Sequence, residues 1–247
     1  MREIKGRVAL VTGGAVRVGR AIVEGLAEAG ADVIVHYHHS ADAAQEAVAA
    51  ARGLGVHAMA VQADLANPGD VAELLTAIRD RHEHVDILVH SASPFVAGSI
   101  DTLTLDSWRQ VMGAVVEGFL LLVQALAPEM VARGTGNIIT VLDEGAFDPW
   151  PKFLAHSAAK SALWAVTRSL AVDLAPHVRV NSVVGGPILA PPGQSEARQA
   201  RIAAGTLMGR WGRPQDLVDA VLFLVRSDYI TGEALFVDGG QRWAHRR

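Results

Sequence analysis

The sequence predicts an α/β fold, a doubly wound, seven-stranded parallel sheet flanked by helices on both faces. Short runs rich in Val, Ile and Leu alternate along the chain with longer, Ala-rich stretches of helical periodicity. The short runs are apolar throughout rather than strictly alternating, as expected of parallel strands buried on both faces. The expected strands cover residues 7–11, 32–37, 56–61, 86–89, 137–142, 179–183 and 234–237.

The Ala-rich stretches have the length of helical crossovers, which join parallel strands of one sheet. Asn67 followed by Pro68 marks the start of the third helix, because a capping side chain precedes proline in the first turn. No Pro- or Ser-rich run or charge block separates two parts of the chain, so a single domain over residues 1–247 is expected. The expected helices cover residues 18–29, 41–52, 69–81, 105–131, 155–174 and 215–226.

The composition argues against several kinds of partner. The 247 residues carry a net charge of −4 with both signs interspersed, and no basic stripe indicates nucleic acid. No cysteine is present, so disulfides and cysteine-zinc sites are excluded, and no metal site is expected. The apolar stretch 118–127 has about half of the ~20 residues that a membrane span needs, and no apolar signal segment precedes the first strand. A cytoplasmic protein without a nucleic-acid or membrane partner is expected.

The turn after the first strand is a candidate nucleotide site, because ligands of doubly wound sheets bind beyond the carboxyl ends of the strands. Residues 12–19 read Thr-Gly-Gly-Ala-Val-Arg-Val-Gly and lead into the first helix. Small residues let the backbone approach a pyrophosphate, which the N–H groups and dipole of the helix N-terminus attract. An ordinary tight turn is the alternative, but the strand–turn–helix context favours a Rossmann-type dinucleotide site. The candidate residues are Thr12, Gly13, Arg17, Val18 and Gly19.

The end of the second strand indicates which dinucleotide binds. An acidic residue about 20 positions past the glycines would bind the ribose hydroxyls of NAD. Residues 36–40 read His-Tyr-His-His-Ser instead, so a 2′-phosphate would meet a hydroxyl, imidazole donors and the Arg17 guanidinium. Asp64, after the third strand, can contact the adenine or cap the next loop. The alternative is that the histidines only cap a polar strand end, but together these residues favour NADP(H). The candidate residues are His36, Tyr37, His38, Ser40 and Asp64.

These motifs resemble the classical short-chain dehydrogenase/reductase family over essentially the whole chain. Its other markers correspond here to residues 64–65, 179–181, 213–214, 231–232 and 238–240. Arg17, the 36–38 stretch and Asp143, thirteen residues before His156, are most similar to the pteridine reductase branch. The resemblance implies a small-molecule substrate and a homotetramer that dimerises through the two long helices. It also implies further cofactor contacts at Leu65, Ser91, Ala92, Lys160, Gly186 and Ile188.

The sequence departs from the family at the positions that carry its proton relay. The usual Tyr-x-x-x-Lys reads His156-Ser-Ala-Ala-Lys160. The usual Asn-Asn-Ala-Gly after the fourth strand reads His-Ser-Ala-Ser from His90, and Val115 stands where the long fourth helix usually carries Asn. The resemblance therefore implies the cofactor site more firmly than the usual catalysis.

The residues themselves suggest a modified catalytic triad. His156 and Lys160 lie four positions apart and share one face of a helix, and Lys160 there can hydrogen-bond the nicotinamide ribose. The lysine charge favours a neutral imidazole, which is a poor proton donor, whereas a carboxylate at Asp143, if close, favours imidazolium. A protonated C=N group needs less help from an acid than a simple ketone does. The catalytic candidates are Asp143, His156 and Lys160.

We therefore expect an NADPH-dependent reductase that acts on a pterin-like C=N or an activated carbonyl. A catalytically atypical or inactive nucleotide-binding homologue, acting as a sensor or scaffold, is the alternative, and a non-redox enzyme on the same fold is another. Aromatic residues in the loops near Phe95 and 147–151 can sandwich a flat heterocycle or merely anchor the loops. Residues 190–206 lie where the family carries a substrate lid, with Pro and Gly at its root.

Overall fold

The computed structural model describes residues 3–191 and 193–246. The expected single domain over 1–247 and the expected lid over 190–206 therefore each include positions outside the described residues. Pro192 is the position of the lid that is not described.

The seven strands form one parallel sheet in the order β3-β2-β1-β4-β5-β6-β7, which confirms the predicted fold class. The order reverses between β1 and β4, and such a switch point opens a crevice at the carboxyl ends of the two strands. The sheet thus places the turn after β1 beside the loop after β4. The strands are β1 (Val8–Thr12), β2 (Asp32–Tyr37), β3 (Ala58–Gln62), β4 (Ile87–His90), β5 (Gly136–Asp143), β6 (Val178–Gly185) and β7 (Ala234–Val237).

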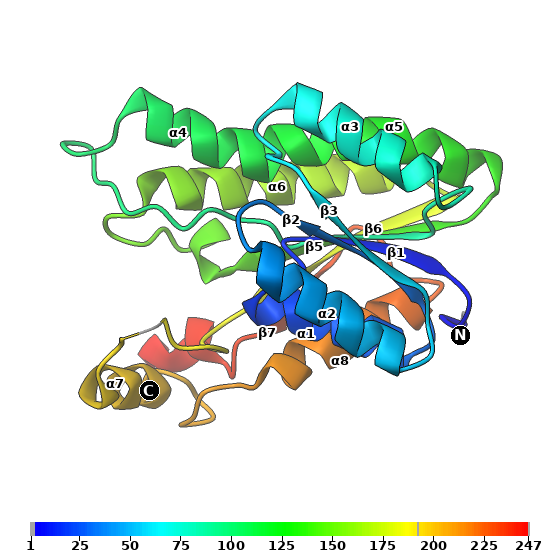
Figure 1. The fold of residues 1–247 in the computed structure, drawn as a ribbon. Helices are drawn as coiled ribbons and strands as arrows, with labels where there is room; N and C mark the ends of the chain where they lie inside the picture. Colours follow the sequence, from blue (N-terminus) through cyan, green and yellow to red (C-terminus); the bar gives the residue numbers. More distant parts are fainter. Residues whose placement is uncertain (1–2, 192, 247) are drawn as a thin grey trace.

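Helices cover both faces of the sheet, as Figure 1 shows. The helices α1, α2 and α8 lie on one face, and α3, α4, α5 and α6 lie on the other. Helix α7 stands apart from both layers, near the C-terminus. The helices are α1 (Arg17–Glu28), α2 (Ala41–Gly53), α3 (Pro68–Arg79), α4 (Leu105–Met112), α5 (Gly118–Ala132), α6 (Leu154–Asp173), α7 (Glu196–Ala204) and α8 (Pro214–Arg226).

The predicted strand boundaries differ from the observed ones by at most two residues, and β6 is three residues longer than expected because both of its ends extend. It pairs with β5 over eight residues, from Gly136 opposite Val178 to Asp143 opposite Gly185. This pairing extends the ordered sheet to Asp143, which holds that side chain at a defined place on the carboxyl edge. The predicted start of α3 is confirmed, since the Asn67 side chain accepts a hydrogen bond from the Gly69 N–H at 2.9 Å.

The long helix expected over 105–131 is continuous but contains a π-helical turn, Gly113–Glu117, between α4 and α5. The helix passes close to the loop after β3. A Cβ atom at Gly113 would lie 2.8 Å from the Ala66 Cβ, and one at Gly118 would lie 2.4 Å from the Leu65 carbonyl oxygen. Glycine at both ends of the π turn therefore permits this close approach. The helical periodicity of the sequence does not distinguish such a turn from ordinary α-helix.

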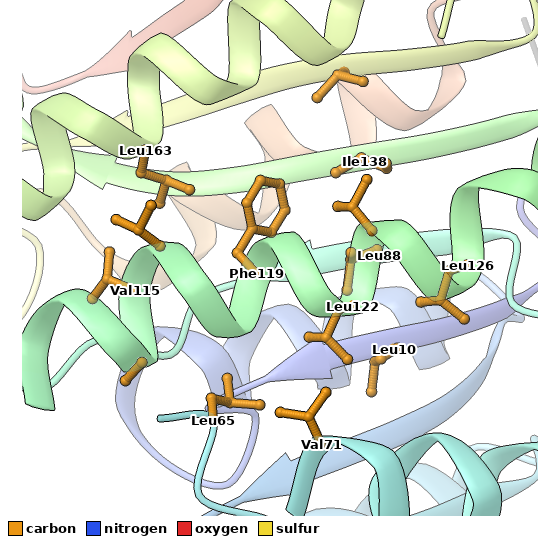
Figure 2. Close-up of a cluster of buried hydrophobic side chains, with 14 of the residues drawn as sticks. Leu10, Leu65, Val71, Leu88, Val115, Phe119, Leu122, Leu126, Ile138 and Leu163 are labelled. Atoms are coloured by element: carbon orange, nitrogen blue, oxygen red, sulfur yellow. The ribbon is translucent and has the colours of Figure 1, made fainter. Parts of the chain in front are cut away.

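Helix α5 also forms much of the core on its side of the sheet. Figure 2 shows Phe119, Leu122 and Leu126 of α5 beside Leu88 of β4 and Ile138 of β5, and all five are buried. Full burial of a large apolar side chain contributes about 1.5–3 kcal/mol. Residues Leu105–Ala132 are long and apolar enough to cross a membrane by length and composition alone, yet 61% of the apolar window is buried inside the protein. This helix packs as a core helix of the sheet fold.

Candidate active site

A cavity of about 270 Å³ lies at the carboxyl ends of the first four strands, where the strand order reverses between β1 and β4. The glycine-rich turn, the end of β2 and the loops after β3 and β4 form its walls. The predicted cofactor residues that line it are Gly13, His36, Tyr37, His38, Ser40, Asp64, Leu65 and Ala92. Thr12, Arg17, Val18, Gly19 and Ser91 are near neighbours of these walls in the chain, whereas Lys160, Gly186 and Ile188 lie on or after α6 and β6.

The turn after β1 has the backbone that a pyrophosphate site requires. Gly13 has φ +64°, and a Cβ atom there would lie 2.9 Å from the Ala92 Cα. A Cβ atom at Gly19 would lie 2.1 Å from the Gly13 carbonyl oxygen, so glycine lets the first turn of α1 pack on the loop. The N-cap residue of α1, Val16, makes no side-chain capping bond and lines the cavity. An anion can therefore satisfy the N–H groups at the start of this helix.

Two hydrogen bonds of His36 fix the glycine-rich turn relative to the loop after β3. Its Nδ1 accepts a hydrogen bond from the Gly13 N–H at 3.1 Å, and its Nε2–H donates to the Ala63 carbonyl oxygen at 3.1 Å. Burial lowers the pKa of His36 to about 4, so the ring is neutral at physiological pH. Both ring nitrogens of His36 are thus hydrogen-bonded to backbone groups. His36 therefore shapes the turn rather than supplying the phosphate donor that the sequence suggested.

Thr12 and His90 form a second buried hydrogen-bond network beside the glycine-rich turn. The Thr12 hydroxyl donates to His90 Nδ1 at 2.9 Å and accepts from the N–H groups of Ser91 and Ala92, both at 3.1 Å. His90 Nε2–H donates to the Val115 carbonyl oxygen in the π turn at 3.1 Å. Burial, and then the nearby charge of Lys160, lower the pKa of His90 to about 3. His90 is thus a neutral structural residue with both nitrogens satisfied, and it ties the π turn to the glycine-rich turn.

The end of β2 presents polar side chains to the cavity. The rings of His38 and His39 are stacked with centroids 3.5 Å apart. Ser40 is the N-cap residue of α2 but makes no side-chain capping bond there. Asp64 accepts a hydrogen bond from the Ala66 N–H at 3.0 Å, and another of its oxygens lies 4.0 Å from His38 Nε2. Asp64 therefore caps the loop after β3 and also lines the cavity, which fits both interpretations of this residue.

The structure brings Asp143 at the end of β5 and His156 on α6 into direct contact. His156 Nε2–H donates to Asp143 Oδ2 at 2.8 Å, and the other carboxylate oxygen accepts from the Gly145 N–H at 2.9 Å. Lys160, one helical turn further along α6, donates from Nζ to the Val141 carbonyl oxygen at 2.7 Å. The expected proximity of Asp143 and His156 is therefore observed, with the buried Lys160 ammonium beside them.

The side chains of Asp143 and His156 are buried to very different extents. The Asp143 side chain is 22% exposed, whereas the His156 side chain is only 3% exposed. Burial by itself would raise the pKa of Asp143, but the His156 hydrogen bond and the Lys160 charge outweigh it and lower that pKa below its ordinary value. Burial lowers the pKa of Lys160, while Asp143 opposes this shift. Asp143 is thus a partly exposed carboxylate, and the imidazole that hydrogen-bonds it is buried.

Aromatic rings surround the remaining faces of His156. The Trp150 ring lies parallel to the imidazole with centroids 5.8 Å apart, and the Phe95 ring meets it edge-on at 5.0 Å. Phe153 stacks on Phe95 at 4.4 Å. Phe95 is 56% exposed, so this aromatic wall, formed by Phe95, Trp150 and Phe153, is partly open to solvent. Ring stacking and edge contacts of this kind also suit a flat aromatic ligand.

Glu144, which directly follows Asp143, is a buried acid that the sequence interpretation missed. Burial, together with the nearby carboxylates of Asp238, Asp148 and Asp143, raises the pKa of Glu144 to about 7. Its Oε1 atom is buried without a hydrogen-bond partner among the described residues. Asp238 follows β7, so no local pattern in the sequence reveals this carboxyl pair.

The loop after β6 approaches the end of β7. A Cβ atom at Gly186 would lie 2.6 Å from the Asp238 Cα, so this position needs glycine. Ile188 and Asp238 line a second cavity of about 180 Å³ together with Arg210 and Asp216. This cavity is separate from the one at the glycine-rich turn. Gly186 therefore packs against the end of β7, and Ile188 lines the second cavity rather than the one at the glycine-rich turn.

Comparison with known proteins assigns the fold to a family. A family profile described as enoyl-(acyl carrier protein) reductase matches residues 14–242. Dehydrogenase/reductase SDR family member 4 of Sus scrofa is 33% identical over an alignment of 248 positions, which covers 97% of this chain and 88% of the relative. The chain belongs to the short-chain dehydrogenase/reductase family. The family resemblance inferred from the motifs is thereby confirmed, and the chain is a member of a family of oxidoreductases.

Two solved structures of this fold were determined with a nicotinamide dinucleotide phosphate. A blue fluorescent protein from a metagenomic library in complex with NADPH is 33% identical, with a TM-score of 0.89, covering 97% of this chain and 99% of that one. FolM alternative dihydrofolate reductase 1 from Brucella canis, complexed with NADP, is 30% identical, with a TM-score of 0.88, covering 97% and 96%. Each of these names describes the protein in that structure and not this chain.

Several residues at the site escaped sequence reasoning. His39, which belongs to the 36–40 stretch but is not among the candidate residues, lines the cavity and stacks on His38. Gln110 and Ala114 reach the cavity from α4 and the π turn, where the helical pattern carries no such signal. The hydroxyl of Ser157 accepts a hydrogen bond from the Trp150 N–H at 3.2 Å and so anchors the aromatic wall.

Proposed function

We propose that this short-chain dehydrogenase/reductase is an NADPH-dependent reductase that acts on a flat, pterin-like C=N compound or an activated carbonyl. The observation that carries this proposal is the arrangement of Asp143, His156 and Lys160. A partly exposed carboxylate is backed by a buried imidazole and a buried ammonium, beside an aromatic wall.

The cofactor is NADP(H), and the residues of the cavity fit it. The uncapped N-terminus of α1 suits the pyrophosphate, and the absence of a carboxylate at the end of β2 suits a 2′-phosphate. The Ser40 hydroxyl and the His38 ring line that end of the cavity. Lys160, Ser91, Gly186 and Ile188 are the proposed contacts at the nicotinamide end. Both solved structures described above contain this dinucleotide, which supports the assignment.

When bound, the nicotinamide supplies a hydride, and the chain's own residues must then manage one proton. His156 is buried and spends Nε2 on Asp143, so Asp143 is the side chain of the pair that can meet a ligand. We propose that Asp143 contacts a ring N–H or a bridging water and that His156 holds the proton that passes through this carboxylate. Lys160 orients the ribose, and its charge is balanced by the Asp143 carboxylate beside it. A protonated C=N suits this site, because a substrate cation is stabilised by the Asp143 carboxylate.

The aromatic wall supports a flat substrate. Phe95 stands edge-on to His156, and Phe153 stacks on its ring. Because Phe95 is still 56% exposed, the exposed part of its ring can contact a ligand beside Asp143. The dihydrofolate reductase name of the Brucella canis structure is consistent with a pterin-like ring, although that activity belongs to that protein. We further propose that residues 190–206 form the substrate lid, and that the enzyme is a cytoplasmic homotetramer.

NADPH oxidation with a panel of a dihydropterin, a cyclic imine and a diketone tests the proposal. We expect turnover with at least one acceptor, loss of turnover in Lys160→Ala, and a decrease in kcat of about 100-fold or more in Asp143→Asn. Asp106→Asn is the matched control, because Asp106 is an almost fully exposed acid on α4. Turnover in Asp143→Asn equal to that of the control variant would contradict the assigned role of Asp143.

One observation favours a second function, a nucleotide-binding protein without redox turnover. The Nδ1 atom of His156 is buried and has no hydrogen-bond partner among the described residues, so the imidazole does not face a substrate directly. This alternative predicts tight NADPH binding together with no oxidation across the whole panel. It also predicts that His156→Ala leaves the binding constant unchanged.

A further inference from the structure

The carboxyl edge of the sheet brings two acids together across the end of β6. The last row of strand pairing ends one residue before Glu144 on β5, before Gly186 on β6 and before Asp238 on β7. Strands two places apart in a sheet are separated by about 9–10 Å, so two acidic side chains meet only if nothing stands between them. A Cβ atom at Gly186 would lie 2.6 Å from the Asp238 Cα. Glycine in the middle of this row therefore leaves room for Glu144 to reach Asp238.

The two acids share a proton in a buried place. Glu144 is 7% exposed and Asp238 is 6% exposed, and their carboxyl groups form a hydrogen bond. This bond needs a proton on one of them, because a carboxylate has no donor. Asp238 Oδ1 accepts from the Gly240 N–H at 3.0 Å, and its Oδ2 accepts from the Arg242 N–H at 3.3 Å. These donors favour the ionised form of Asp238, so Glu144 holds the proton and donates it.

The charged groups around the pair make this proton titrate near neutral pH. The carboxylates that interact with Glu144 are those of Asp238, Asp148 and Asp143. The cations of this region pair with those neighbours instead, His156 and Lys160 of α6 with Asp143, and Arg242 after β7 with Asp238. Burial and the carboxylates raise the pKa of Glu144 to about 7. Above that pH, two buried carboxylates repel each other at this place.

The backbone of Glu144 belongs to the turn that orients Asp143. A short 3₁₀ helix, Glu144–Ala146, follows Asp143 directly, and Asp143 Oδ1 accepts from the Gly145 N–H at 2.9 Å. On its far side, the turn is fixed to α6 by the Ser161 hydroxyl, which donates to the Ala146 carbonyl oxygen at 2.8 Å. The shared proton fixes its near side to β7. A displacement of Glu144 therefore moves the N–H group that holds the Asp143 carboxylate.

We propose that Glu144 is a positioning residue, whose shared proton with Asp238 holds the turn that orients Asp143. The inference rests on the proposed function, because Asp143 is the side chain that meets the substrate in that proposal. While the proton is present, the turn is fixed at both ends and Asp143 is held between Gly145 and His156. Once the proton is lost, Glu144 moves away from Asp238 and the Asp143 carboxylate loses its fixed orientation. Reduction of the substrate then slows.

The variant Glu144→Gln separates the shared proton from the shape of the side chain. Its amide N–H donates to Asp238 at every pH and cannot ionise. With NADPH and the best acceptor of the panel, the ratio of kcat in Glu144→Gln to kcat in the wild type should be about one at pH 6. At pH 8.5 it should be about tenfold or more, because a group with a pKa of about 7 is mostly ionised there. Glu28→Gln is the matched control and should follow the wild type at both pH values, since Glu28 is exposed at the end of α1.

Hydrogen exchange of the Gly145 amide, followed by NMR, reports the position of the turn without any acceptor. Comparison of two proteins at one pH cancels the intrinsic effect of pH on exchange. Exchange should be equal in the wild type and Glu144→Gln at pH 6, and about tenfold faster in the wild type at pH 8.5. Glu144→Leu, which has no donor for Asp238, should show fast exchange at both pH values.

Two results would overturn the positioning role of Glu144. One is a ratio of kcat values that stays constant from pH 6 to pH 8.5, and the other is Gly145 exchange that is equal in the wild type and Glu144→Gln at pH 8.5. Either result leaves the proposed function intact. A wild type that oxidises NADPH with no acceptor of the panel would instead overturn the proposed function, and Gly145 exchange would still decide whether the shared proton holds the turn.

Discussion

Glu144 is expected to make the folded protein lose stability as the pH rises from 4.5 to 7. Burial and the carboxylates of Asp238, Asp148 and Asp143 raise its pKa in the folded state from 4.5 to about 7. Between these values the folded state holds a proton that the unfolded state has released. Stability therefore falls with rising pH across this window, and the loss is complete above the folded-state pKa.

The size of the effect follows from the two pKa values. Each pH unit of difference corresponds to about 1.4 kcal/mol, so the interval from 4.5 to about 7 corresponds to about 3 kcal/mol. Glu144→Gln keeps the shape of the side chain and cannot ionise. The variant should match the wild type near pH 4.5 and exceed it by up to about 3 kcal/mol at pH 8.5. For a chain of this length that difference is about 6–12 °C in thermal midpoint.

Urea denaturation at pH 4.5, 6, 7 and 8.5 measures this effect for the wild type and Glu144→Gln. Glu28→Gln is the matched control, because Glu28 is an exposed glutamate at the end of α1. The stability difference between Glu144→Gln and the wild type should grow steadily with pH, whereas the control should follow the wild type. A difference that is independent of pH would refute the argument that Glu144 carries a proton in the folded protein at pH 6.

Two further predictions concern the cofactor cavity. His36→Leu removes the partners of the Gly13 N–H and the Ala63 carbonyl, and should lower the free energy of unfolding by about 2–5 kcal/mol and weaken NADPH binding. His38→Leu, at a side chain that is 40% exposed, is its control for urea denaturation, and equal losses in both variants would contradict the structural role of His36. Ser40→Ala should weaken NADPH binding about tenfold in a fluorescence titration and leave NADH binding unchanged, because only NADPH carries the 2′-phosphate. An equal loss for both cofactors would place the phosphate elsewhere.

Much of the fold could be predicted because apolar periodicity records burial. The seven strands and the order of elements follow from runs such as Val33, Ile34 and Val35, which are fully buried in β2. The contact between Asp143 and His156 could be expected as well, because β5 and α6 are consecutive and both residues fall at the carboxyl edge of the sheet. Local pattern and topology were sufficient for these features.

Other features depend on contacts that no local pattern records. Glu144 acquires its raised pKa from burial and then from Asp238 on a distant strand end, and Arg17 finds its carbonyl partners beyond β6. The π turn at Gly113–Glu117 continues the helical periodicity of the sequence. The sequence pattern therefore does not reveal it, whereas the folded structure shows it together with the close approach of Gly113 to Ala66. The sequence predicts His36 at the cofactor because an imidazole at a strand end resembles a phosphate donor. The structure shows instead that the backbone occupies both of its nitrogens.

The central claim is that the site formed by Asp143, His156 and Lys160 transfers hydride from NADPH to a small molecule. Single-turnover mixing of the protein with NADPH deuterated at C4, in each of its two stereochemical forms, and a dihydropterin tests it most directly by mass spectrometry. The account predicts that deuterium appears in the reduced pterin from one of the two forms, and that Lys160→Ala abolishes the transfer. NADPH that binds tightly but keeps its deuterium with the dihydropterin, a cyclic imine and a diketone alike would contradict the claim.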